Sequence, residues 1–372
     1  MERRDFVRTG LALGTIGVTG LPTVERTWRS AAAAADPLRL DSNENPLGLA
    51  PLARRAVIDG IPEGNRYPDA AHNDLIDALA AKHGVAPASV VIGAGSTDVL
   101  RMLVQATAGP GARIVVADPT FEDVPSYAEP FGFQVERVPL TSTYAHDIDR
   151  MRTVAHASTA PTLVFLCNPN NPTGTLTSCA AIDEWAAEAP DHVRFIIDEA
   201  YFEYVDDPGY WTSVPWIASR PNVVVVRTFS KIHGMAGMRA GYGIAHPDTA
   251  AKLRVHQGRN NVGYLTLVAA LASLRDRDLV ARGTASNTRA RAILTDALAA
   301  LAVEHIPSHT NFLMHRITGD LRTYIDRMRQ AGARVGRPFP PLTGFNRVSL
   351  GLPEEMERFA ALLHDFRRQN WI

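Results

Sequence analysis

Cysteine is scarce in this sequence: of 372 residues only two, Cys167 and Cys179, are cysteines. Two cysteines provide neither a disulfide framework nor the ligand spacing of a cysteine-based metal site. The 12 histidines are scattered, and the pair His305 and His309, interrupted by Pro307, does not fit the helix that carries paired zinc ligands. We therefore expect no metal site, and Cys167, which ends an apolar run, is expected to pack in the core.

An excess of charge of one sign is also lacking, because 38 Lys and Arg residues balance 39 Asp and Glu residues, for a net charge of −1. This balance leaves no basic stripe or tail, so no nucleic-acid partner is expected. Long apolar runs are few: the run from Leu11 to about Val24 is short and rich in glycine. It is too short for a comfortable membrane-spanning helix, so stable insertion into a membrane is not expected.

The first residues carry a targeting pattern. Arg3 and Arg4 are followed by one polar residue and then by Phe6-Val7, which is typical of a twin-arginine export signal. The small residues Ala31 to Ala35, after the apolar run, suit a signal peptidase. We predict a signal segment over residues 1–36 and export to the periplasm or the extracellular space. The alternative is an ordinary N-terminal helix on a cytoplasmic protein.

After Pro37, apolar runs alternate with Ala- and Leu-rich stretches. The apolar runs are predicted strands, over residues 90–92, 113–117, 163–166, 195–197, 223–227 and 242–245. Helices are predicted over residues 73–82, 98–107, 180–189 and 266–274. Strands separated by helices indicate an α/β fold with a mostly parallel sheet and helices on both of its faces. The pattern around residues 311–315 and 347–350 indicates a smaller α+β domain at the C-terminal end.

A lysine follows the β-branched run 223–226, in the order Arg227-Thr228-Phe229-Ser230-Lys231, and Arg239 lies eight residues further on. A strand that ends in a loop holds a lysine amine in a pocket, and a hydroxyl and a guanidinium beside it bind an anion. Pyridoxal 5′-phosphate (PLP) needs this arrangement, because Lys231 would form a Schiff base while Ser230 and Arg239 hold the phosphate. Taken alone, Lys231 is equally compatible with a surface position at a strand end.

Two further apolar runs end in polar residues. One ends at Asp198, and a carboxylate there pairs with the pyridine nitrogen of PLP and keeps it protonated. The other ends at Asn168 and continues into a Pro- and Asn-rich turn that contains Asn171. Asn171 and Tyr201 are expected to donate hydrogen bonds to the phenolic oxygen of the ring. The alternatives are that Asp198 caps a helix and that the turn is only a turn.

Several motifs stand in one order along the chain. They are Asn43-Glu-Asn-Pro-Leu-Gly48, Arg66-Tyr-Pro-Asp69, Gly93-Ala-Gly-Ser-Thr-Asp98, Asp118-Pro-Thr-Phe121, Asn168-Pro-Asn-Asn-Pro-Thr-Gly174, Asp198-Glu-Ala-Tyr201, Ser230-Lys231, Arg239, Thr310-Asn-Phe312 and Asn346-Arg-Val-Ser-Leu-Gly351. With them the chain resembles the fold-type I PLP-dependent aminotransferases of class I/II, and most closely their histidinol-phosphate aminotransferase-like branch. The resemblance runs from about residue 38 to the end, and aromatic amino-acid aminotransferases share most of it.

The resemblance implies a seven-stranded sheet sandwiched by helices, the PLP transferase fold of type I, with the smaller α+β domain beside it. It divides the chain into residues 37–65, which join the small domain or line the site, a large PLP-binding domain over 66–255, and a small C-terminal domain over 256–372. It also implies a homodimer with shared active sites, because Tyr67 matches the position that reaches the partner's cofactor phosphate.

Roles for further residues follow from the same resemblance. Ser96 and Thr97, which precede a helix, are expected to bind the phosphate, although a plain helix cap is the alternative. Phe121 matches the aromatic residue that stacks on the pyridine ring. Arg347 matches the arginine that binds the anionic group of the substrate.

The match of two remaining residues is looser. Arg337 aligns with a second arginine of the histidinol-phosphate branch, but the proline-rich stretch after it departs from the usual pattern. Asn43 is expected to position the substrate or to serve in a turn. The implied activity is amino transfer between a small amino acid or amino phosphate, histidinol-phosphate-like or aromatic, and a 2-oxo acid. Lys231, assisted by Asp198, would be the base. A decarboxylase, lyase or oxidase on the same scaffold is the alternative.

Overall fold

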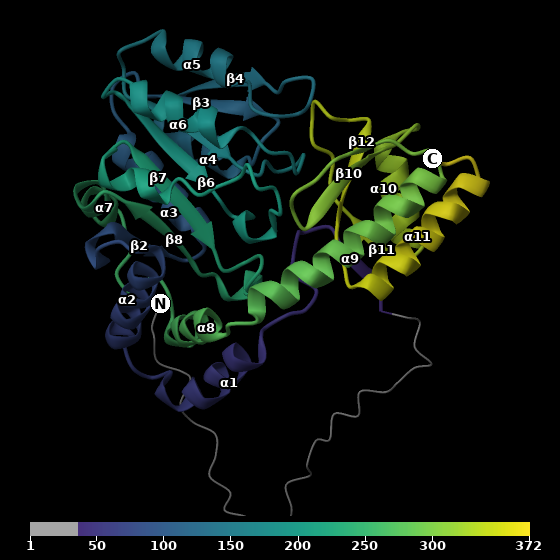
Figure 1. Ribbon diagram of the computed structural model, residues 1–372, viewed down its shortest axis with the longest axis horizontal. Helices are drawn as coiled ribbons and strands as arrows, with labels where there is room; N and C mark the ends of the chain where they lie inside the picture. Colours follow the sequence, from purple (N-terminus) through teal and green to yellow (C-terminus); the bar gives the residue numbers. More distant parts are fainter. Residues whose placement is uncertain (1–35) are drawn as a thin grey trace, which may run out of the picture. The chain divides into compact units, whose positions relative to one another are not determined.

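The computed structural model describes residues 36–372. The expected export signal, except for Asp36, therefore lies outside the described residues. Figure 1 shows the helices and strands with their labels. Within residues 36–372, no helix has the length and apolar character needed to cross a membrane.

A mixed sheet of seven strands carries the fold. Its order is β2 (Val90–Gly93), β8 (Gly241–Ala245), β7 (Val223–Thr228), β6 (Val193–Asp198), β5 (Thr162–Cys167), β3 (Arg113–Asp118) and β4 (Gln134–Pro139). Only β8 runs antiparallel to its neighbours, β2 and β7. The expectation of a mostly parallel sheet is confirmed, and each of the six strands predicted from an apolar run is present. Strand β4 was not expected from the sequence, because half of the residues of this edge strand are polar and the strand is only partly buried.

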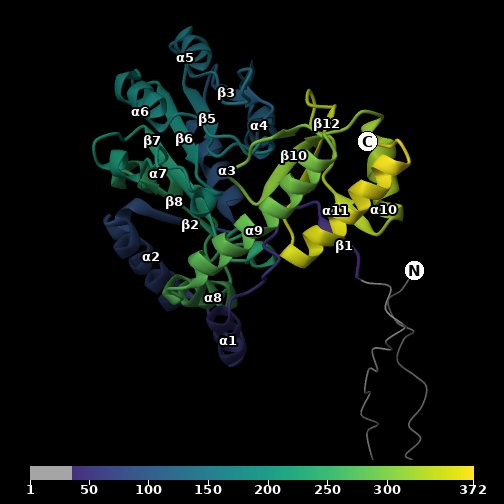
Figure 2. The same cartoon turned by 45° about the vertical axis from the view of Figure 1, so that its right-hand side comes forward.

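Helices cover both faces of this sheet (Figure 2). The first face is covered by α1 (Pro51–Gly60), α2 (Asp69–His83), α5 (Ile148–His156), α6 (Cys179–Glu188) and α8 (Tyr264–Arg275). The second face is covered by α3 (Ser96–Thr107), α4 (Asp123–Ala128) and α7 (Pro247–Arg254). Successive side chains of the central strands point to opposite faces of the sheet. In β7, Val223 and Val225 lie in the core on the first face, and Val224 and Val226 lie in the core on the second. Strands buried on both faces read as continuous apolar runs, as this one does.

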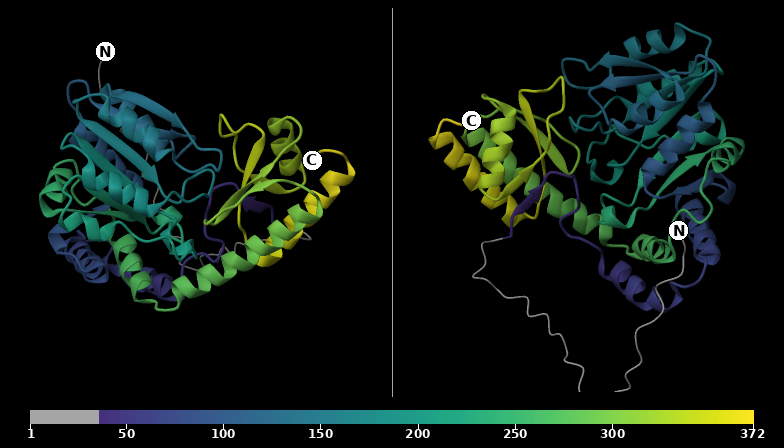
Figure 3. Two further views of the ribbon diagram at one scale, coloured as in Figure 1. Left: turned by 45° about the horizontal axis from the view of Figure 1, so that its top comes forward. Right: turned by 180° about the vertical axis from the view of Figure 1, so that it is seen from behind.

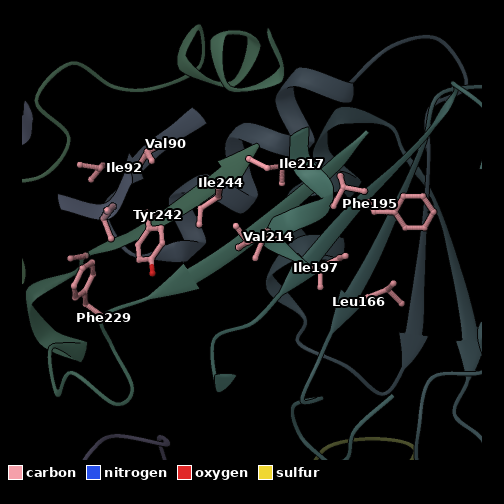
Figure 4. Packing of buried hydrophobic residues seen from close by; sticks show 14 of the residues in the cluster. Val90, Ile92, Leu166, Phe195, Ile197, Val214, Ile217, Phe229, Tyr242 and Ile244 are labelled. Atoms are coloured by element: carbon pink, nitrogen blue, oxygen red, sulfur yellow. The ribbon is translucent and has the colours of Figure 1, made fainter. Parts of the chain in front are cut away.

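The first core continues past the end of β7. Figure 4 shows Phe229 and Tyr242 beside one another, with Ile244, Ile197 and Leu166 further along the sheet. The ring centroids of Phe229 and Tyr242 are 5.7 Å apart. Because Phe229 is buried one residue after β7 ends, the chain is anchored where it turns toward Ser230 and Lys231.

The C-terminal elements form a separate core. Helix α9 (Leu279–Ala300) leads from α8 to β9 (His305–Ile306), β10 (Phe312–Arg316), α10 (Leu321–Gln330), β11 (Ala333–Val335), β12 (Phe345–Ser349) and α11 (Pro353–Arg368) (Figure 3). The N-terminal strand β1 (Leu38–Leu40) pairs in parallel with β11 and buries both its leucines in this core. Helix α8, in contrast, packs Leu267 and Ala270 into the first core of the large sheet. The four-segment division of the chain stays a prediction.

Candidate active site

The carboxyl ends of the parallel strands meet at one edge of the sheet, where open α/β sheets place their ligands. A pocket of about 430 Å³ lies there. It is lined by the following residues that the sequence singled out: Asn43, Ser96, Thr97, Phe121, Asn171, Asp198, Tyr201, Ser230, Lys231, Arg239, Arg337 and Arg347. Tyr67 is not among the lining residues, and its side chain is 83% exposed. Within one chain, therefore, every predicted site residue except Tyr67 comes together.

Lys231 follows β7 and points its amine into the pocket. Its Nζ donates a hydrogen bond to the main-chain oxygen of Asn43, at 3.1 Å, and lies 5.5 Å from the ring centroid of Tyr201. Burial lowers the pKa of Lys231 to about 8, and the guanidinium of Arg347 adds to the shift, while Asp198 opposes it. A substantial fraction of the amine is therefore neutral near pH 8, which is the form that attacks a carbonyl or accepts a proton.

Asp198 is the last residue of β6 and is buried at the floor of the pocket. Its Oδ1 accepts a hydrogen bond from the amide of Ala200, at 3.1 Å. Burial raises the pKa of Asp198 to about 7, and the neighbouring Glu199 carboxylate adds to this, against the Ala200 amide and Lys231. A buried carboxylate that forms no ion pair among residues 36–372 is suited to accept a positively charged N–H group of a ligand.

Asn43 joins the segment before α1 to the rest of the site. Its side-chain Nδ2 donates to Tyr201 Oη at 3.1 Å, and its main-chain N–H donates to Ser349 Oγ at 2.7 Å. Asn311 Nδ2 donates to the main-chain oxygen of Asn43 at 3.0 Å, the same atom that Lys231 contacts. The backbone of Asn43 has a φ of 53°, a left-handed conformation that asparagine tolerates better than most residues. Asn43 thus fixes Tyr201 and Lys231 relative to the C-terminal strands.

An anion cradle lies at the start of α3. Gly95 has a φ of 83°, and a Cβ on it would lie 2.2 Å from Nη2 of Arg239, so only glycine allows the guanidinium to come this close. Arg239 Nη1 donates to Ser230 Oγ at 3.3 Å. Ser96 is the first residue of α3, whose free amide groups and dipole attract a negative charge. These groups together suit a phosphate.

Arg347 lies on β12 and enters the pocket from the C-terminal core. Its Nη1 donates to Asn171 Oδ1 at 2.7 Å and its Nη2 to the main-chain oxygen of Asp41 at 3.0 Å. Burial lowers the pKa of Arg347 to about 10, so it stays charged at neutral pH, and its buried Nε has no hydrogen-bond partner among the described residues. The guanidinium therefore still has a donor to offer a ligand.

Phe339 lies beside two guanidinium groups in the same pocket. Arg347 Cζ is 4.5 Å from the ring centroid of Phe339, and Arg337 Cζ is 4.3 Å from it. Arg337 is exposed, and its Nη1 donates to the main-chain oxygen of Pro338, at 3.0 Å. The proline-rich stretch that departs from the family pattern thus brings an aromatic ring and a second cation into the pocket.

Some lining residues were not singled out by the sequence: Glu44, Glu122, Asp123 and Phe339. Burial raises the pKa of Asp123, while a hydrogen bond from Thr97 and the charge of Arg239 oppose the rise. Asp123 lies only two residues after Phe121, and this short spacing was the signal in the sequence that could have placed Asp123 in the pocket. Phe339 carried no signal, since the loop that delivers it has no periodic pattern. Among residues 36–372, no cluster of three His, Cys, Asp or Glu side chains is arranged to hold a metal ion.

The residues present fit PLP. The cradle of Gly95, Ser96, Ser230 and Arg239 offers donors and positive charge for the phosphate, and a Cβ at Gly95 would close it. The buried carboxylate of Asp198 suits the ring nitrogen, and the partly neutral amine of Lys231 suits the carbonyl carbon. Fold and pocket together are those of a PLP-dependent enzyme.

Comparison with known proteins identifies the group within that class. Residues 35–363 match the family aminotransferase class I and II, and the chain belongs to this family. It is 38% identical to histidinol-phosphate aminotransferase of Moorella thermoacetica, over 89% of this chain and 85% of that protein. It is 37% identical to an aromatic amino acid aminotransferase of Streptomyces coelicolor, over 94% and 96% of the two chains.

A solved structure points the same way. The crystal structure of histidinol-phosphate aminotransferase from Sinorhizobium meliloti, in complex with pyridoxal 5′-phosphate, matches 90% of this chain and 91% of its own. The TM-score is 0.84 and the sequence identity is 28%. The expected fold type, the PLP cofactor and the aminotransferase activity are confirmed.

Proposed function

We propose that this aminotransferase moves an amino group between an amino compound that carries an anionic group, an amino acid or amino phosphate, and a 2-oxo acid. The observation that carries the proposal is Arg347. It is a buried cation whose Nε has no partner among the described residues, in the same pocket as the amine of Lys231. A planar guanidinium suits bidentate binding of a carboxylate or a phosphate.

The residues divide the work as follows. Bound PLP supplies the electron sink that labilises bonds at the substrate's α-carbon. Lys231 Nζ would hold the cofactor, and this amine, partly neutral in the pocket, would be the general base for the proton of the α-carbon. The Asp198 carboxylate would keep a proton on the ring nitrogen. Asn171 and Tyr201 would hold the phenolic oxygen, and Phe121 would pack on the ring.

The substrate class rests on the second arginine and the ring beside it. Arg337 and Phe339 add a cation and an aromatic surface to the pocket. This pair suits a substrate with a second anionic group or a flat ring, and the similar proteins named above act on histidinol phosphate or on aromatic amino acids. Decarboxylation, lyase or oxidase chemistry on the same scaffold stays the alternative, because the reaction depends on which substrate bond is held perpendicular to the ring.

We also propose a homodimer with shared sites. Tyr67 lies outside the pocket of its own chain and is 83% exposed. Large apolar side chains of α1 and the turn after it are exposed as well: Leu52 by 50%, Ile58 by 53% and Ile61 by 59%. Apolar surface of this kind marks protein interfaces, and a second copy of the chain would bring its Tyr67 to the cofactor phosphate.

The proposed export through the twin-arginine route rests on Arg3, Arg4 and the small residues Ala31 to Ala35. The route carries folded proteins, which suits an enzyme that takes up its cofactor before transport. Replacing both arginines by lysine should leave active enzyme in the cytoplasm, measured by cell fractionation. Unchanged fractionation of that variant would favour a cytoplasmic enzyme.

The reaction itself is tested with a panel of amino donors. Purified PLP-loaded enzyme is incubated with histidinol phosphate, aromatic amino acids and small amino acids, each with 2-oxoglutarate. The proposal requires formation of glutamate and of the matching carbonyl product, detected by mass spectrometry. Release of carbon dioxide or uptake of oxygen without glutamate would instead establish the alternative chemistry.

A further inference from the structure

A second pocket of about 400 Å³, nearly the volume of the active site, lies at the opposite edge of the same sheet. It opens at the amino ends of β6 and β7, whose carboxyl ends carry Asp198 and lead to Lys231. Its walls come from both faces of the sheet: Leu103 of α3 and Leu253 of α7 on one side, and Ala186 of α6 on the other. Figure 1 shows these helices around β6 and β7.

The charged groups of this pocket are unbalanced. Three cations line it, Arg194, Arg220 and Lys252, against the single carboxylate of Asp191. Like charges in one hollow repel each other, and none of the three cations forms an ion pair among residues 36–372. An anion in the pocket would remove this repulsion.

The three cations differ in what they contact. Arg194 Nη1 donates to the main-chain oxygen of Ala106, at 3.2 Å, and so satisfies the C-terminal end of α3. The Cζ of Arg220 lies 5.8 Å from the ring centroid of Trp216, and its buried Nε has no hydrogen-bond partner among the described residues. A buried donor without an acceptor is costly. The guanidinium of Arg220 therefore has a donor to offer a ligand, and the side chain of Lys252, which lines the same pocket, is exposed.

The pocket walls are held in place without a ligand. Thr249 Oγ1 donates to the main-chain oxygen of Pro221 at 2.6 Å, which ties α7 to the loop before β7. Asn222 Nδ2 donates to the main-chain oxygen of Val193 at 3.2 Å, which ties the starts of β7 and β6 together. Ligand sites are usually preformed in this way, with a few polar groups placed on an apolar wall.

We propose that this pocket binds a small oxyanion, a molecule with two or more carboxylate or phosphoryl groups, through Arg220 and Lys252. Guanidinium and ammonium groups bind both kinds of oxyanion, and the fork of Arg220 binds two oxygens at once. The site is distinct from the substrate pocket, because the two lie at opposite ends of the strands and share no lining residue.

The test uses PLP-loaded full-length enzyme, so that the cofactor's own phosphate cradle is filled. Citrate and inorganic pyrophosphate are titrated separately by calorimetry. We expect one or both to bind once per chain, with binding at least about tenfold weaker in the double variant Arg220→Ala, Lys252→Ala. Preference for citrate would indicate a carboxylate ligand, and preference for pyrophosphate a phosphoryl ligand.

A matched control removes the same charge elsewhere. Arg277 and Arg289 are exposed, and the double variant Arg277→Ala, Arg289→Ala should bind like the wild type. The proposal is overturned if neither probe binds the wild type, if the pocket variant binds unchanged, or if the control loses affinity equally. The cofactor absorbance of each variant shows whether the protein still folds and binds PLP, independently of oxyanion binding. Failure of this proposal therefore leaves the proposed reaction untouched.

Discussion

Two side chains at the strand ends owe their chemistry to burial. The pKa of Lys231 is lowered to about 8 and that of Asp198 is raised to about 7. In water the two groups would carry opposite full charges at neutral pH. Burial therefore makes the amine of Lys231 more reactive. It also disfavours the ionised carboxylate of Asp198 unless a cation lies beside it, and a protonated ring nitrogen is such a cation.

Lys231→Ala should abolish covalent attachment of the cofactor. The chain contains only three lysines, Lys82, Lys231 and Lys252, so the attachment site is easily mapped. Borohydride reduction of the wild-type enzyme followed by mass spectrometry should place PLP on Lys231, and the alanine variant should show no reduced adduct. Lys252→Ala is the control and should label normally. An adduct that persists in Lys231→Ala would show that another amine holds the cofactor.

Asp198→Asn should stabilise the cofactor-free protein at high pH. The folded pKa of Asp198, about 7, lies above its ordinary value of 3.8. The ionised form is thus penalised in the fold: the penalty is absent well below pH 4, grows as pH rises and is complete above about 7. We expect a gain in unfolding free energy on the order of 2–4 kcal/mol at pH 8, fading toward pH 4.

Urea denaturation across this pH range measures the effect. The exposed Asp74→Asn serves as the control and should show no such trend. In the holoenzyme the same Asp198→Asn change should lower turnover strongly, because the ring nitrogen loses its anionic partner. If Asp198→Asn is no more stable than the wild type at any pH, burial does not penalise the ionised form of Asp198 in the folded protein.

At the scale of elements, the turn after β6 depends on a buried ion pair. Arg227 of β7 donates from Nε and Nη2 to Glu199 Oε2, at 3.0 and 2.7 Å, and the amide of Ser213 donates to Glu199 Oε1 at 2.8 Å. Glu199 directly follows Asp198 in the chain. The pair therefore fixes the backbone that orients Asp198 and, two residues further on, Tyr201.

Arg227→Met should destabilise the protein by about 3–5 kcal/mol, because it leaves the Glu199 carboxylate buried without its cation. The double variant Glu199→Leu, Arg227→Met should recover part of this loss, measured as a double-mutant cycle in urea. Arg137→Met, which breaks a half-exposed pair with Glu122, is the control and should cost about 0–1 kcal/mol. If Arg227→Met costs no more than about 1 kcal/mol, the buried pair has no large structural role.

At the scale of the whole molecule, one predicted site residue remains outside the pocket of its own chain. Tyr67 is exposed, while the other predicted residues converge. A two-fold dimer in which each copy completes the other's site would account for this division.

Subunit mixing tests this arrangement. Lys231→Ala and Tyr67→Ala homodimers should each have little activity, the first because it lacks the amine and the second because its cofactor is held weakly. After unfolding and refolding together, mixed dimers should contain one intact site, made from Lys231 of one copy and Tyr67 of the other. Random pairing gives roughly a quarter of the wild-type site number. No recovery of activity would mean that Tyr67 serves its own chain.

The sequence by itself determined most of the sheet and most of the site. Strands buried on both faces read as apolar runs, and polar residues at their carboxyl ends, such as Asp198 and Lys231, must meet at one edge of a parallel sheet. Such patterns are local, so they can be recognised without knowing the packing. The edge strand β4 was not predicted from the sequence, because neither of its faces is apolar throughout.

Only the tertiary structure decided which distant segments share the pocket and how they change its chemistry. The place of Phe339 and Asp123 beside the arginines depends on loops without a periodic pattern. The hydrogen bonds of Asn43 to Tyr201 and Ser349 join residues 158 and 306 positions apart. The altered pKa values of Lys231 and Asp198 arise chiefly from desolvation, which exists only once the chain has packed around them.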